Sequence, residues 1–210
     1  MPKNYLAYIL LVFATLCWSG NFIVGKFAYL FEVPPLTLNF LRWASVWFIL
    51  IPFTYKEIYN NLPYIKKNWF VISFMGIITI STFNSVVYFA LNYTQVINAV
   101  LVLSAIPAVT IVISSLMKVD KTNIFQLIGL LLSIIGVTAI ISNADIQKIT
   151  ALSFNKGDLW MLVCVFTWAI YSTLLKKHNF KFSQFTLIQL MVSFGIIFLI
   201  PQFFYEKSIG

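Results

Sequence analysis

The sequence predicts an all-α membrane protein, a helical bundle of seven transmembrane spans. Of its 210 residues, 60% are hydrophobic and only 10% are charged, whereas charged residues make up about 25% of an ordinary soluble domain. Residues 68–117 contain no Lys, Arg, Asp, Glu or His. The apolar runs are continuous, whereas the strands of a membrane barrel alternate apolar and polar residues. Helices are therefore expected, because they satisfy their own backbone hydrogen bonds within lipid.

The uncharged run 68–117 is expected to cross the membrane twice. As a single helix it would be about 75 Å long, whereas the hydrocarbon core of a bilayer is about 30 Å thick. The tetrapeptide Asn92-Tyr93-Thr94-Gln95 interrupts the run with polar or interfacial residues. The sequence thus predicts two antiparallel spans joined by a tight uncharged turn, at Trp69–Leu91 and Val96–Met117.

The other apolar runs are separated by segments with charged residues or prolines. They predict five more spans, at Tyr5–Ala28, Leu36–Phe53, Ile124–Ile141, Gly157–Lys176 and Phe185–Phe204. The first run is too long for a signal peptide and lacks a small-residue cleavage pattern. Residues 56–67 are expected to form a polar, basic loop.

The distribution of basic residues predicts the orientation. With the N-terminus inside, nine Lys residues fall in cytoplasmic segments and four outside, as the positive-inside rule requires. The net charge of +8 is therefore a topology signal, and no nucleic-acid partner is expected. The sequence predicts an integral protein of the plasma (bacterial inner) membrane with a cytoplasmic N-terminus.

The chain contains an internal repeat. Offsets of 150 or 149 residues superpose Trp18 on Trp168, Lys26 on Lys176, Thr37 on Thr186 and Pro52 on Pro201. The repeated unit holds five spans, an odd number, so the second copy enters the membrane from the opposite side. Inverted repeats of this kind are typical of secondary transporters, whose substrate site lies near the midplane.

The repeat divides the chain into three parts. Residues 1–143 are expected to form a first five-helix repeat, and residues 144–156 a linker. Residues 157–210 are expected to form the first two helices of a truncated second repeat.

Five motifs follow one another in an order typical of one transporter family. They are Cys17-Trp18-Ser19-Gly20-Asn21 with Lys26, Asn39-Phe40-Leu41-Arg42-Trp43, Tyr88 to Ala99 followed by Pro107, Asp120-Lys121 with Gln126, Gly129 and Gly136, and Gly157-Asp158 with Thr167-Trp168-Ala169 and Tyr171. In this order they resemble the ten-span EamA family of the drug/metabolite transporter superfamily. The resemblance covers the front two-thirds of a member, so the chain is expected to be C-terminally incomplete. It implies transport of amino acids or related metabolites.

Arg42 is the one charged residue expected deep within a span. Such a charge costs at least about 2.5 kcal/mol at a helix centre and normally faces a cavity or a partner. No acidic residue lies in the core of an expected span, so a substrate carboxylate, water or backbone carbonyls are its candidate partners. The alternative is that Arg42 extends to the lipid headgroups.

Polar and aromatic side chains recur on single faces of the expected helices. Trp18 and Asn21 are three residues apart, as are Trp168 and Tyr171 in the second copy. They are candidate substrate-binding residues, and the alternative is aromatic packing with hydrogen bonds between helices.

The central pair of spans supplies three further candidates for substrate binding, namely Asn84, Tyr88 and Asn98. Amides between membrane helices can also serve only to join them. Pro107 is a candidate hinge, because it leaves the carbonyl group of Leu103 without its helical partner.

These features favour a secondary transporter or exporter of small polar organic metabolites, such as amino-acid or drug-like solutes, that works by alternating access. The alternative is a truncated, non-transporting fragment or a subunit completed by another chain. An enzyme is not expected, because the spans lack the paired acids, Ser/His pair or metal ligands of intramembrane hydrolysis. No cofactor or metal is expected, and Cys17 and Cys164 are interpreted as buried, inert thiols. The expected partners are the lipid bilayer and the substrate, with a homodimer left open.

Overall fold

The computed structural model describes residues 3–121, 123–141 and 155–209, and all regular elements within them are helices. They are α1 (Lys3–Leu30), α2 (Pro35–Asn60), α3 (Leu62–Gly76), the π-helix η1 (Ile77–Phe83), α4 (Asn84–Ala90), α5 (Val96–Leu103), α6 (Ile106–Leu116), α7 (Ile124–Ile141), α9 (Lys156–His178) and α10 (Gln184–Ile209). The all-α class is thereby confirmed. The expected linker 144–156 lies outside the described residues as far as residue 154.

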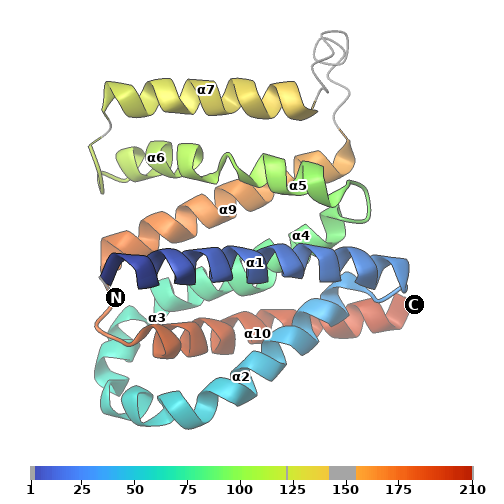
Figure 1. Cartoon of the computed structure of the whole chain (residues 1–210). Helices are drawn as coiled ribbons and strands as arrows, with labels where there is room; N and C mark the ends of the chain where they lie inside the picture. The colour runs from blue at the N-terminus through green and yellow to red at the C-terminus, as the bar shows by residue number, and fades with distance from the viewer. Residues whose placement is uncertain (1–2, 122, 142–154, 210) are drawn as a thin grey trace.

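Six helical stretches of the described chain are long and apolar enough to cross a membrane. One of them runs through α3, η1 and α4, and the next through α5 and α6, with the expected turn between Leu91 and Gln95. A shorter apolar stretch, Ile124–Gly136, belongs to α7, whose bounds match the predicted fifth span. Figure 1 shows that α1 begins and α10 ends at opposite ends of the bundle, which is the arrangement that an odd number of crossings produces.

The prediction of a loop at residues 56–67 is wrong. Helix α2 continues through Pro52 to Asn60, and α3 begins at Leu62. The backbone N–H of Asn61, between the two helices, donates to the carbonyl groups of Glu57 and Ile58 at 3.1 and 3.2 Å. Charged residues do not end a helix here, because a long lysine side chain can extend to water while its backbone remains helical.

Two helices of the C-terminal part organise the packing. Helix α10 lies against α2, α3 and η1, whereas α9 lies against α4, α5, α6 and η1. Figure 1 shows α7 and α2 at opposite edges of the bundle. Large apolar side chains on α1, such as Leu11 and Phe13, are exposed, as expected of a helix that faces lipid.

Helix α10 and the α3–η1 segment approach each other at two glycines. A Cβ atom added to Gly76 would lie 2.3 Å from the carbonyl oxygen of Met191. A Cβ atom added to Gly195 would lie 2.5 Å from Cβ of Ile80. Small residues of this kind allow membrane helices to pack backbone against backbone.

The π-helix receives support from a buried side chain of α2. Asn39 is fully buried, and its Nδ2 donates to the Ile80 carbonyl oxygen at 3.0 Å and to Ser85 Oγ at 2.9 Å. A π-helix is rare in proteins, and those that occur are often found at functional sites. The side chain of Asn39 therefore joins α2 to the part of the bundle where the backbone departs from α-helical geometry.

The turn between α4 and α5 is held from two sides. Lys26 Nζ donates to the carbonyl oxygens of Leu91 at 2.7 Å and Thr94 at 3.2 Å. Thr94 Oγ1 donates to Oδ1 of the buried Asp158 in the first turn of α9 at 2.8 Å. Lys26 thus satisfies carbonyl groups that the end of α4 and the following turn leave without helical partners.

Candidate functional site

Arg42 lies on α2 and turns its guanidinium group into the bundle. Its nitrogen atoms donate to Asn84 Oδ1 at 2.5 Å, to the Tyr88 hydroxyl oxygen at 2.6 Å and to Asn21 Oδ1. Its Cζ also lies 4.8 Å from the centre of the Trp43 ring. The partners of Arg42 are therefore amide and phenol oxygens supplied by α1 and α4, in place of the water or backbone carbonyls considered from the sequence.

The positive charge of Arg42 has no carboxylate partner within the described part of the chain, where Lys176 and Asp120 form the ion pair. A guanidinium group has five N–H donors. Arg42 donates three hydrogen bonds to side chains of the bundle. Donors are left over for a ligand, and the charge itself favours an anionic one.

The neighbours of Arg42 are themselves held in place. Asn84 Nδ2 donates to the Thr79 carbonyl oxygen within η1 at 2.6 Å, which directs the other end of the amide to the guanidinium group. The Tyr88 hydroxyl group donates to Asn21 Oδ1 at 2.7 Å. The π-helix thereby positions a side chain of the site, a connection that spacing in the sequence does not show.

A cavity of about 460 Å³ opens beside this cluster. Its lining combines the polar residues Asn21, Arg42, Thr79 and Asn84 with the aromatic residues Trp18, Trp43, Phe83, Trp168 and Tyr171. The rings of Trp18 and Trp168 are stacked with centroids 5.5 Å apart. A cavity with an apolar wall and a few convergent polar groups is the usual form of a small-molecule site.

A second cavity, of about 510 Å³, shares Trp18 and Trp168 with the first. Pro107 lines it, close to the point where α5 ends at Leu103 and α6 begins at Ile106. The break in the helix is consistent with the kink expected of Pro107, and its role as a hinge stays a prediction.

The structure brings together seven of the eight candidate binding residues. Six line the first cavity, and Tyr88 bonds to Arg42 from α4. Asn98 is partly buried on α5 and lies outside the lining of both cavities.

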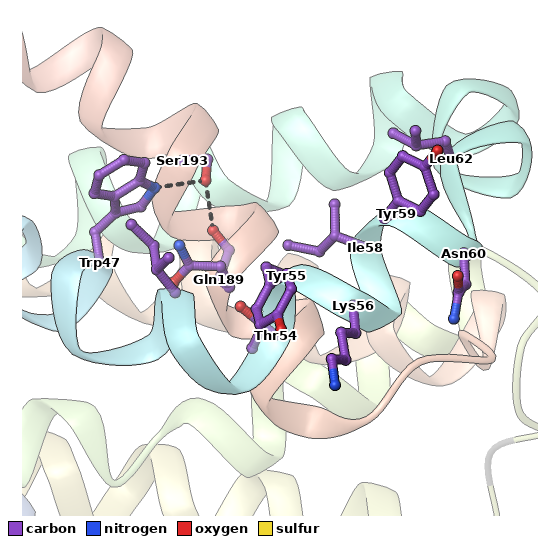
Figure 2. A pocket seen from close by; sticks show the side chains of 11 residues that line it. Trp47, Thr54, Tyr55, Lys56, Ile58, Tyr59, Asn60, Leu62, Gln189 and Ser193 are labelled. Atoms are coloured by element: carbon purple, nitrogen blue, oxygen red, sulfur yellow. Dashed lines mark hydrogen bonds between the residues drawn. The ribbon is translucent and has the colours of Figure 1, made fainter.

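A third cavity, of about 700 Å³, lies between α2 and α10 (Figure 2). Sequence reasoning did not identify Gln189 in its wall, although this residue is 3% exposed and its Oε1 has no hydrogen-bond partner among the described residues. It also missed Glu57 and Glu206. The signal that identifies these two acids is their separation of 149 residues, which equals the offset of the repeat.

The two thiols differ in exposure. Cys17 is exposed and lines the first cavity, so its interpretation as a buried thiol is wrong. Cys164 is fully buried.

We expect a small maleimide to label Cys17 in the folded protein and to leave Cys164 unreacted. Mass spectrometry of the labelled chain before and after unfolding checks this, and equal labelling of both thiols in the folded state would contradict it.

Comparison with known proteins places the chain in a family. The model of the EamA-like transporter family matches residues 5–142, which is more than half of the chain. The chain belongs to the EamA-like transporter family. The part matched runs from α1 to the end of α7.

Three relatives of this EamA-like chain are named as uncharacterized transporters. One from Archaeoglobus fulgidus is 29% identical over 198 residues, which are 94% of this chain and 67% of the relative. YyaM of Bacillus subtilis is 27% identical over 82% of this chain and 56% of its own length. YetK of the same organism is 24% identical over 99% of this chain and 63% of its own length. The chain thus spans about three-fifths of the length of these relatives, and no solved structure matches it.

Proposed function

We propose that this EamA-like protein acts in secondary transport of small organic metabolites, with the substrate bound beside Arg42. The observation that carries the proposal is a guanidinium group with neutral partners at the wall of a cavity of about 460 Å³. Charged residues within membrane spans are rare, and those that face the bundle interior commonly mark substrate or ion pathways.

The lining of the cavity favours a substrate with two parts. A carboxylate would pair with the guanidinium group, because the two are geometrically matched for charge-assisted hydrogen bonds. An apolar or aromatic body would lie among Trp18, Trp168 and Tyr171. Amino acids and related carboxylates have this form.

Transport by alternating access would use the duplicated architecture. In this proposal, residues 1–143 form one repeat and residues 157–210 begin its inverted copy, with the substrate site between them. A substrate moves such a protein between its two states only through a difference in affinity for them. The proposed location is the plasma membrane, with a cytoplasmic N-terminus and therefore with α2 ending on the cytoplasmic side.

The test is flux into proteoliposomes that contain the purified chain. Labelled phenylalanine and phenethylamine form a matched pair, since the amine keeps the ring and lacks the carboxylate. We expect flux of the amino acid and little of the amine, with empty liposomes as the control. Equal flux of the two compounds, or none of either, would count against the proposed site.

The alternative from the sequence is a truncated fragment that does not transport, or a subunit that transports only with another chain. The relatives, which are longer than this chain, are the observation that favours its test. Reconstitution of this chain with and without a separately expressed C-terminal part of the Archaeoglobus relative distinguishes the two. Flux that requires the second polypeptide favours the subunit, and flux from the chain alone excludes it.

A further inference from the structure

Helices α2 and α10 pack against each other in an antiparallel arrangement, and the C-terminal end of α10 contacts the start of α2. Glu206, near the end of α10, accepts hydrogen bonds from the backbone N–H groups of Leu36 at 3.1 Å and Thr37 at 2.6 Å. Pro34 at the N-cap supplies no side-chain hydrogen bond. A carboxylate from the neighbouring helix thus satisfies N–H groups that a helix start leaves unpaired.

The other ends of the same two helices make the matching contact. Glu57, near the end of α2, accepts from the backbone N–H of Ser183 at 2.8 Å. It also accepts from Ser183 Oγ and Thr186 Oγ1, each at 2.5 Å. Each helix therefore receives at its N-terminus a carboxylate from the C-terminal end of the other.

The two contacts are related by the offset of the repeat. Glu57 and Glu206 are 149 residues apart, as are Thr37 and Thr186. A contact between Thr37 and the second-copy glutamate thus has its counterpart in a contact between the first-copy glutamate and Thr186. Such an exchange of partners is what a two-fold relation between two copies produces.

The space beside the two contacts is different. Near Glu206, the rings of Phe40 and Phe203 are stacked between the helices with centroids 4.8 Å apart. The residues at the same offset near Glu57 are Gln189 and Thr54. These smaller or polar side chains line the cavity of about 700 Å³ between the two helices (Figure 2). Glu206 itself lines a smaller cavity, of about 410 Å³, whose other walls come from α4 and α9.

We propose that Glu57 and Glu206 are equivalent latches, one at each membrane face, whose separate release opens the bundle to one face at a time. The proposal rests on the proposed transport function, for which it supplies the moving contacts. Glu57 holds the end of α2 to the start of α10, and Glu206 holds the opposite ends of the same helices. The cavity of about 700 Å³ beside Glu57 gives that end room to move, whereas near Glu206 the Phe40–Phe203 stack fills the corresponding space between α2 and α10.

The energetics of the contacts suit a reversible latch. Each carboxylate bonds to N–H or hydroxyl groups at a helix start and has no lysine or arginine partner among the described ion pairs. Interactions of an acid with a helix N-terminus change an equilibrium by roughly two- to fivefold. Such a contact is strong enough to shift the balance of two states and weak enough to break during a transport cycle.

The experiment uses Cys17 as a reporter at the wall of the first cavity, beside Arg42. In a Cys164→Ser background, Glu57→Gln and Glu206→Gln weaken one latch each while keeping the shape of the side chain. Glu32→Gln, in the exposed turn between α1 and α2, is the matched control. The measured quantity is the rate at which a membrane-impermeant maleimide labels Cys17, in vesicles of each orientation.

We expect Glu57→Gln to raise the rate of labelling from the face that carries Glu57, and Glu206→Gln to raise it from the opposite face. The expected change is roughly two- to fivefold in each case, with no change for Glu32→Gln. Thr186→Val removes one donor to Glu57 and should act in the same direction as Glu57→Gln. Its isosteric shape keeps the test informative should a glutamate variant fail to insert.

Two results would overturn the latches. One is a change of equal size at both faces in each variant, and the other is unchanged labelling in all of them. The outcomes for transport are separate, because labelling needs no substrate. Face-specific labelling without flux of any solute would retain the latches and reject the proposed function, whereas flux with unchanged labelling would retain the function and reject the latches.

Discussion

Replacement of Arg42 by alanine is expected to remove substrate binding and flux. The change takes away the guanidinium group that would pair with a carboxylate, and it leaves Asn21, Asn84 and Tyr88 without their common donor. Loss of one partner of a buried charged contact costs about 2–5 kcal/mol, or at least roughly 30-fold in affinity. Equilibrium binding of labelled phenylalanine to the purified protein measures the loss directly.

Two further variants separate the role of charge from that of shape. Arg42→Lys keeps the charge but places a compact ammonium group where a planar one spans three acceptors, so binding should be only partly restored. Lys67→Ala removes an exposed charge on α3 and should bind as the unchanged protein does. Binding by Arg42→Ala at the level of Lys67→Ala would exclude Arg42 from the site.

Replacement of Gly76 by alanine is expected to have the largest effect on stability. The added methyl group would lie 2.3 Å from the carbonyl oxygen and 3.1 Å from Cα of Met191. These are backbone atoms of α10, which cannot move aside as the end of a side chain can, so the helices must separate. Overpacking typically costs 1–3 kcal/mol and at times more, and detergent-solubilised Gly76→Ala should therefore show a markedly lower Tm and yield.

Glycines in open surroundings provide the control for this prediction. A Cβ atom added to Gly20 or Gly129 would meet nothing within 4 Å. Because alanine favours a helix by up to about 1 kcal/mol over glycine, Gly20→Ala should leave Tm unchanged or raise it. A Tm of Gly76→Ala equal to that of Gly20→Ala would show that α10 and the end of α3 do not meet as closely as described.

Much of the helical framework could be predicted because lipid restricts the alternatives. Continuous apolar runs with polar interruptions are sufficient to locate helices when the backbone has to satisfy itself. The ends were harder to predict, because Lys56 and Glu57 suggested a loop whereas α2 remains helical to Asn60. A membrane helix that continues into water carries charges without losing its backbone hydrogen bonds.

The polar residues of the candidate site could be predicted because polar residues are rare within the apolar spans. Arg42, Asn21 and Asn84 are polar residues within apolar spans, and such residues tend to meet inside a bundle. What the spacing could not show is which of them share a partner. Asn98 has the same character as Asn84, yet it lies apart from the cavity because α5 presents it elsewhere.

The contacts between the ends of helices were outside the reach of single-helix patterns. Glu57 bonds to Ser183 across 126 residues of sequence. No periodicity within α2 reveals such a partner, since it depends on how distant segments are placed beside each other. The repeat offset was the available clue, and it required comparison of polar residues beyond the apolar spans.

The wide turns of η1 have a geometric consequence for the helix that contains them. Before η1, the side chain of Met75 is buried in the core. After η1, the side chains of Asn84 and Tyr88 contact Arg42. Each residue advances an ordinary helix by about 100°, so a chain shortened by one residue within 77–83 would have to aim one of these two faces wrongly. The length of η1 therefore determines the angle, about the helix axis, between the face of α3 that packs in the core and the face of α4 that contacts Arg42.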